Sequence, residues 1–237
     1  MLKKLILSMA ACSFLFATAQ AQKYISLGPV VGFGHSGVSN GDFGSNVDVK
    51  SDFHPSFNFG LSLIYAKNPH WGFGGELLFS QEGYKKTFTD KSISDFSFDE
   101  TNNASYIRLP LRVYYFFGQY KQKVRPKVYA GPSFGFNVGN NIKRDASDNA
   151  IQSIVDGAPK ADFNAFDLGL QVGAGANITL SKAVWLNLDL NYYQGFLDAV
   201  KDPKHVSFYD DIKTGTNLNN HLRLEVGVLF GLGKLRQ

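Results

Sequence analysis

Apolar and polar residues alternate along most of this chain with a period of two residues. Successive side chains of a β-strand point to opposite faces, so the pattern predicts strands with one apolar and one polar face. Helical periodicity is almost absent. Eight segments carry the alternation, and we expect strands at residues 25–33, 57–65, 71–82, 107–115, 128–138, 166–179, 186–192 and 221–232.

The connections between these segments alternate between short and long. Short ones fall near residues 66–70, 118–126 and 181–183, and long polar ones near residues 36–54, 85–104, 140–163 and 198–218. Short turns at one end and long loops at the other are typical of barrels that cross the outer membrane. The predicted fold class is therefore all-β: an eight-stranded antiparallel up-and-down transmembrane β-barrel with short periplasmic turns and long extracellular loops.

Charged residues on the polar faces indicate which face lies inside. A soluble lipocalin-like barrel also alternates, with its apolar residues inward. Here arginine occupies mid-strand polar positions, whereas lysine is confined to turns, loops and strand ends. An enclosed interior favours arginine paired with carboxylates, because the guanidinium group forms several fixed hydrogen bonds. We predict an interior polar network that fills the narrow barrel and leaves no large channel, made of Glu76, Glu82, Arg108, Arg112, Asp167, Asp189, Arg223 and Glu225.

Aromatic residues gather near both ends of the expected strands. Two such belts are typical of the two interfaces of a membrane, although aromatic residues of an ordinary core are the alternative. The belt near the short turns would hold Tyr65, Trp71, Tyr115, Phe117, Tyr120 and Trp185. The belt near the long loops would hold Phe33, Tyr84, Tyr192, Tyr193 and Phe196.

The first residues have the features of a secretory signal peptide. Two lysines precede an apolar stretch, and Ala19-Gln20-Ala21 fits a small-residue cleavage site. We therefore divide the chain into a signal peptide at residues 1–21 and an outer-membrane β-barrel domain at residues 22–237. A lipoprotein site at Cys12 is the weaker alternative, because apolar sequence continues beyond it. This lone cysteine excludes a disulfide framework.

Charge is unevenly distributed along the chain. The formal net charge is +4, but the long loops are acidic and the short turns are basic. We expect a periplasmic basic rim at Lys121, Lys123, Arg125 and Lys127, which would meet phospholipid phosphates or an acidic envelope protein. The acidic loops would bind lipopolysaccharide through divalent cations. Plain solubility of the turns is the alternative to the rim, and a nucleic-acid partner is not expected.

Candidate catalytic chemistry is sparse. None of the five histidines has a metal-binding helical spacing. His205 and Ser207 would share one face of an extended segment, as in a lipid hydrolase, but no orienting carboxylate can be assigned to them. The glycine-rich stretch 169–175 lacks the lysine of a phosphate-binding loop, and it would instead keep an interior stripe narrow. We therefore predict no catalytic, cofactor-binding or metal-binding residues and no enzymatic activity.

Three strand segments carry a family resemblance. Ser105-Tyr106-Ile107-Arg108-Leu109-Pro110-Leu111, Tyr129-Ala130-Gly131-Pro132-Ser133, and Asp167-Leu168-Gly169 with Gly173-Ala174-Gly175 resemble successive strands of the small outer-membrane β-barrel proteins of Bacteroidetes, the PorT-like group. Two features depart from that pattern. Arg108 stands where such proteins often have an acidic residue, and the chain does not end on an aromatic residue, so that Phe230 would serve in the assembly signal. The resemblance implies an outer-membrane location and includes secretion-linked members.

Three classes of function remain compatible with this sequence. The leading hypothesis is a non-enzymatic outer-membrane barrel that is a structural or interaction component of the cell envelope, with a link to secretion or envelope assembly. The first alternative is a porin-like barrel that passes small solutes. The second is an outer-membrane lipid-modifying enzyme, and a soluble periplasmic lipid carrier lies outside all three. Outer-membrane lipids, lipopolysaccharide and an envelope protein are the expected partners.

Overall fold

The computed structural model describes residues 24–39, 47–90, 96–120, 122–146, 148–157, 163–200 and 217–232. Its strands are β1 (Tyr24–Val38), β2 (Val47–Asp52), β3 (Pro55–Ala66), β4 (Trp71–Asp90), β5 (Ser97–Phe116), β6 (Val124–Ala146), β7 (Phe166–Ser181), β8 (Val184–Asp198) and β9 (Leu218–Gly231). One helix, α2 (Asn149–Gly157), lies between β6 and β7. The expected signal peptide lies outside the described residues.

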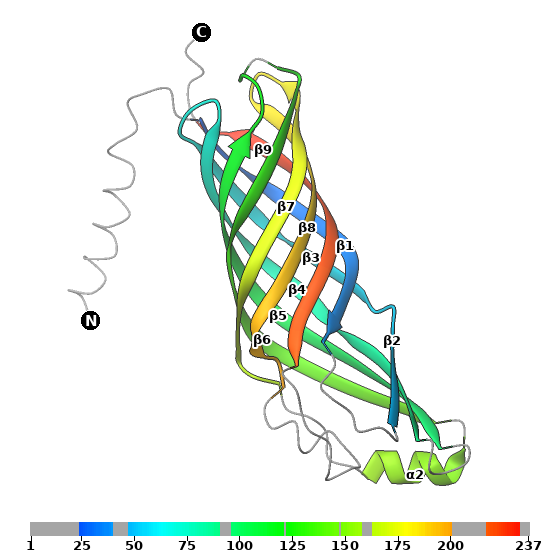
Figure 1. Ribbon diagram of the computed structural model, residues 1–237. Helices are drawn as coiled ribbons and strands as arrows, with labels where there is room; N and C mark the ends of the chain where they lie inside the picture. Colours follow the sequence, from blue (N-terminus) through cyan, green and yellow to red (C-terminus); the bar gives the residue numbers. More distant parts are fainter. Residues whose placement is uncertain are drawn as a thin grey trace, which may run out of the picture.

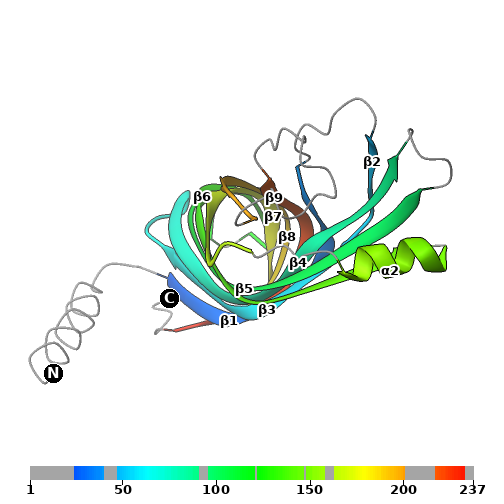
Figure 2. The same ribbon diagram turned by 90° about the horizontal axis from the view of Figure 1, so that it is seen from below.

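Eight of the strands follow one another in a ring. Their order is β4-β3-β1-β9-β8-β7-β6-β5, every neighbouring pair is antiparallel, and β5 also pairs with β4. Figure 2 shows this ring from below. The eight strands expected from the alternation are β1 and β3 to β9, so the predicted all-β up-and-down arrangement is confirmed. Short turns close one end of the ring, which we call the turn end, and we call the opposite end the loop end.

The apolar face of each strand points outward. On β3, Phe59 and Leu61 are about half exposed, whereas Asn58 and Ser62, which flank them in sequence, are buried. The same inversion holds around the ring, because the exposed large side chains are mostly aliphatic or aromatic and the buried ones include many charged groups. This is the arrangement of a barrel whose outer surface meets lipid. Two aromatic expectations were wrong: Tyr84 and Tyr193 are buried inside and do not belong to an outer belt.

Three strands continue beyond the ring at the loop end. β4, β5 and β6 have 20, 20 and 23 residues, whereas β3 has 12. Their extensions, residues 84–90, 97–104 and 140–146, form a lobe together with β2 and α2 (Figure 1). Much of the expected loops 85–104 and 140–163 is therefore regular structure. Gly83 marks the exit from the ring: its φ is +144° and it lies between the parts of β4 that pair with β3 and with β2.

A buried polar triad holds α2 against the lobe. The Tyr84 hydroxyl donates to Glu100 Oε1 at 2.7 Å, and Arg144 Nε donates to Glu100 Oε2 at 2.7 Å. Arg144 Nη1 then donates to the main-chain carbonyl of Val155 in α2, whose side chain is fully buried. The Asp148 carboxylate accepts hydrogen bonds from two main-chain N–H groups in the first turn and caps the helix. The lobe is therefore a packed structure, with its own internal ion pair.

Candidate functional site

The interior of the ring holds two tiers of charged residues. In the tier nearer the turn end, Arg112 donates to Glu76 at 2.6 Å, to Gln171 at 3.0 Å and to Glu225 at 3.2 Å. Its guanidinium also lies over the Tyr129 ring, at 4.6 Å from the centroid. These partners come from β4, β7, β9 and β6. One arginine therefore connects strands from all round the ring, as a planar donor with several fixed hydrogen bonds can do.

The second tier lies nearer the loop end and is centred on Arg108. This side chain donates twice to Glu82, at 2.5 and 2.6 Å, and once to Asp167 at 2.7 Å. Its guanidinium lies between the Tyr106 and Tyr193 rings, with centroid distances of 4.8 and 4.3 Å. Arg223 donates to the same Glu82 at 2.8 Å. The structure thus brings all eight residues of the expected polar network into the interior, where seven belong to these arginine contacts and Asp189 pairs with a different cation.

That cation is Lys127, and its position corrects the sequence-based prediction of a basic rim. Lys127 points into the ring, where its side chain is fully buried and donates to Asp189 Oδ2 at 2.9 Å and to Asn187. Its ammonium also lies over the Tyr114 and Tyr129 rings. The reason is strand parity, because Lys127 is two residues before the inward-facing Tyr129. The parity of β6 was therefore a signal that could have identified it.

The other three rim residues have different environments. Lys123 is exposed at the turn end, and Lys121 lies outside the described residues. Arg125 is mostly buried: its guanidinium lies over the rings of Phe116 and Tyr120 and donates to the carbonyl of Pro69 at 2.5 Å. Of this set, only Lys123 is an exposed cation of the turn end among the residues described. The predicted function of the rim stays a prediction.

Glycines on β7 make room for the interior side chains. A Cβ atom added at Gly173 would lie 2.3 Å from Tyr129 Cζ, and one at Gly169 would lie 2.6 Å from Tyr193 Cε2. Added at Gly175, it would lie 2.0 Å from Asp189 Oδ1. These inward-facing positions must stay small so that the rings and the carboxylate can occupy the interior. The glycine-rich stretch 169–175 therefore leaves room for interior side chains at this part of the barrel wall, as the sequence predicted.

The two tiers leave the interior densely occupied. Together with the Lys127–Asp189 pair they hold five carboxylates and four cations, and these ion-paired side chains are at most 3% exposed. Buried charges are tolerated only when they are paired and hydrogen-bonded. The interior of an eight-stranded barrel is just wide enough for side chains to fill it. The geometry therefore supports a plug made of ion pairs and aromatic rings.

Other candidate chemistry finds little support in the described residues. Within those ranges, no group of three or more His, Cys, Asp or Glu side chains could hold a metal ion. No helix among them is long and apolar enough to cross a membrane. His221 lies in the loop-end tier, stacked on the Tyr193 ring at a centroid distance of 4.9 Å. His205 and Ser207, which carried the hydrolase alternative, lie outside the described residues.

Comparison with known proteins agrees with this architecture. The family model of the outer membrane protein beta-barrel domain matches residues 18–201, so the chain belongs to that family. Membership indicates an outer-membrane location. Among curated proteins, no sequence matches the chain.

Several solved structures of outer-membrane proteins are similar to this chain at low sequence identity. OprG from Pseudomonas aeruginosa is 12% identical, with a TM-score of 0.50 over 91% of this chain and 98% of that protein. Neisserial surface protein A is 15% identical, with a TM-score of 0.38 over 89% and 97%. The outer membrane protease OmpT from Escherichia coli is 8% identical, with a TM-score of 0.33 over 89% and 96%. At these identities the likeness to OprG concerns the fold alone.

Proposed function

We propose that this protein is a non-enzymatic outer-membrane β-barrel that serves as a structural or interaction component of the cell envelope. The filled interior carries the proposal. A barrel that passes solutes needs a continuous polar path, whereas here Arg112 on β5 reaches Glu225 on β9, on the opposite side of the ring. Arg108 fills the next level by joining β4 to β7 through Glu82 and Asp167. The outward apolar face supports a position in lipid, with the turn end in the periplasm and the lobe outside the cell.

The lobe is the surface best suited to an envelope partner. It stands beyond the outward apolar belt, and the buried Tyr84–Glu100–Arg144 triad fixes its shape. Binding to a rigid surface loses less conformational entropy than binding to a flexible loop. The resemblance to the PorT-like group supports a role in secretion or envelope assembly. Lys123, exposed at the turn end, would face phospholipid phosphates in the inner leaflet.

Planar-bilayer recording tests the closed interior. The purified full-length protein, inserted from detergent, should give no stable open channel under an applied voltage. A large and persistent conductance would overturn the proposal and favour the porin-like alternative. Gel electrophoresis checks that the barrel is folded, because a folded barrel migrates differently in an unheated sample than in a heated one.

Fractionation of cells tests the location, and it should recover the protein with the outer membrane. N-terminal sequencing tests the signal peptide, and the mature protein should begin at Gln22.

A further inference from the structure

The wall of the barrel has a seam at the loop end, where β1 and β2 part. β1 pairs with β3 only as far as His35, and with β9 as far as Val38. β2 pairs with β4. The main-chain N–H of Ser36 donates to the carbonyl of His54 at 3.0 Å, and no strand pairing in the described part of the chain joins β1 to β2. Edges of strands that lack a neighbour leave space for another group.

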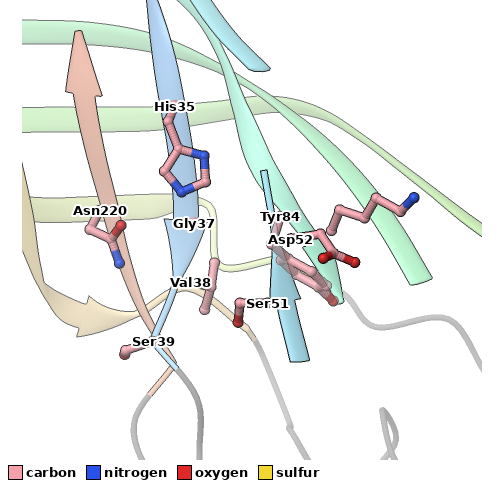
Figure 3. Close-up of a pocket in the computed structure, with 9 residues that line it drawn as sticks. His35, Gly37, Val38, Ser39, Ser51, Asp52, Tyr84 and Asn220 are labelled. Carbon is pink, nitrogen blue, oxygen red and sulfur yellow. The ribbon is translucent and has the colours of Figure 1, made fainter. Parts of the chain in front are cut away.

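A pocket of about 290 Å³ occupies this seam (Figure 3). β1 contributes Gly37 and Val38, β9 contributes Asn220, and β2 and β4 contribute Asp52 and Tyr84. Val38 and Tyr84 are buried and belong to the apolar cluster inside the loop end, whereas Asn220 lies on the outer face of β9. The pocket therefore runs from the outer surface of the wall to an apolar inner end. Its volume is near the lower end of the roughly 300–1,000 Å³ of small-ligand sites, which suits a ligand of about one ring.

The polar groups of the pocket include both donors and acceptors. His35 Nδ1 contacts both the main-chain N–H and the carbonyl oxygen of His54, at 3.1 and 3.2 Å, so Nε2 is the ring nitrogen left to donate to or accept from a ligand. The Asn220 amide offers a donor and an acceptor. The Asp52 carboxylate is an acceptor that Lys50 and Thr87 already contact, and the hydrogen bond from Lys50 holds the pKa of Asp52 below its ordinary value. Lys85 adds one ammonium, paired with Asp99.

The pocket lies at the boundary between the lipid-facing belt and the polar loop end. Two residues before His35 on the same face of β1 is Phe33, which is 62% exposed. Two residues after Asn220 on the same face of β9 is Leu222, which is also exposed. Phe53, 63% exposed, stacks on the His35 ring with centroids 5.1 Å apart and an interplanar angle of 22°. In a membrane this height corresponds to the headgroups of the outer leaflet.

We propose that the seam pocket binds a sugar ring, supplied by the headgroup of an outer-leaflet glycolipid. A sugar presents hydroxyls that both donate and accept, together with C–H faces that pack on aromatic rings, and the pocket offers both kinds of contact. The lining holds one carboxylate, Asp52, and one ammonium, Lys85, so the pocket has no cluster of cations for a phosphate. The inference rests on the proposed function, because the orientation of the lobe toward the outside places the pocket in the outer leaflet.

Filling the pocket tests this inference without removing any polar group. A Cβ atom at Gly37 would lie 3.3 Å from Asn220 Oδ1 and 3.8 Å from His35 Nε2, so Gly37→Val places a side chain in the pocket. Gly139→Val is the matched control, because Gly139 is an exposed strand glycine on β6 whose added Cβ meets only Ser105 Cβ, at 4.0 Å. His35→Phe is a second variant that keeps an aromatic ring beside Phe53 and removes the polar Nε2 atom. Gel mobility of unheated samples shows that each variant is folded.

Binding is measured by fluorescence anisotropy of labelled lipopolysaccharide lacking O-antigen, titrated with the full-length protein in detergent micelles. Gly37→Val and His35→Phe should bind at least about tenfold more weakly than the wild type, and Gly139→Val should bind equally well. Delipidated core oligosaccharide competes in a second arm: competition would show that the sugar alone suffices, and its absence together with the predicted losses would show that the lipid anchor contributes.

Two results would overturn the proposal. One is equal binding of lipopolysaccharide by the wild type, Gly37→Val and Gly139→Val. The other is an equal loss of affinity for labelled phosphatidylglycerol in Gly37→Val relative to the wild type, because this lipid is anionic and carries no sugar ring. Neither result would affect the proposed envelope function, because that is tested separately by conductance and by fractionation.

Discussion

Replacing Lys127 by methionine tests the interior network at the residue that sequence reasoning placed on the surface. Methionine keeps most of the length and apolar volume of the lysine stem, so the change removes the ammonium and opens little space. Asp189 would lose the ammonium at 2.9 Å and keep the Asn187 amide at 2.5 Å. The carboxylate would then be buried without its cation, since its side chain is 1% exposed.

The cost follows from the burial of this pair. Removing one partner of a buried ion pair destabilises a protein by about 3–5 kcal/mol, because the remaining charge is left uncompensated. Each 1.4 kcal/mol is about a factor of ten in the unfolding equilibrium, so Lys127→Met should change that equilibrium by about two to four orders of magnitude. Lys123→Met is the matched control, because Lys123 lies exposed in the turn just before β6, and its replacement should change stability by less than about 0.5 kcal/mol.

Urea unfolding of the protein in detergent micelles, followed by gel mobility of unheated samples, measures these free energies. The double variant Lys127→Met with Asp189→Asn should regain part of the loss, because the uncompensated carboxylate is no longer present. Equal stability of the Lys127 and Lys123 variants would refute the argument from burial. A double variant less stable than the sum of the two single changes would refute the assignment of the cost to Asp189.

Three further outcomes follow from the geometry. Gly173→Ala would force a Cβ atom to within 2.3 Å of Tyr129 Cζ and should cost about 1–3 kcal/mol in urea unfolding, whereas Gly157→Ala, which meets nothing within 4 Å, should be neutral. Burial lowers the pKa of Lys86 to about 8 from an ordinary 10.5, so the unfolded chain binds more protons between these values. The stability of the wild type relative to Lys86→Met should therefore be flat below about pH 8 and rise with pH through that window, as measured by unfolding at pH 7, 9 and 10.5. Leu61→Arg, halfway along β3 on the lipid face, should cost about 2–4 kcal/mol for a barrel folded in vesicles, and a neutral result would argue against a lipid-facing surface there.

Alternation of apolar and polar residues could predict the ring, because one face of each ring strand meets lipid and the other meets the polar interior. The same rule could not predict the lobe. Around Asp99 and Asn102 both faces of β5 are polar, so the sequence has the composition of a loop although its main chain pairs with β4 and β6. The two lysines at 85 and 86 are adjacent in sequence but differ in environment, since Lys86 is buried and Lys85 is half-buried. The strands of the lobe therefore form because β4, β5 and β6 pair with one another, and no local sequence pattern predicts them.

Strand parity could also predict which charged residues lie inside, but it could not predict their partners. Parity places Arg108 and Arg112 on the same face of β5, four residues apart, and says nothing about which carboxylate each one reaches. That choice depends on how far each strand is shifted against the next around the closed ring. The register sets Arg112 opposite Gly74, close to Glu76, whereas Arg108 lies opposite Leu78 and reaches Glu82. Glu225 then joins the first tier from β9, a strand 113 residues further along the chain. Local sequence thus determines which charged residues lie inside, whereas the register of the closed sheet determines how they divide into two tiers.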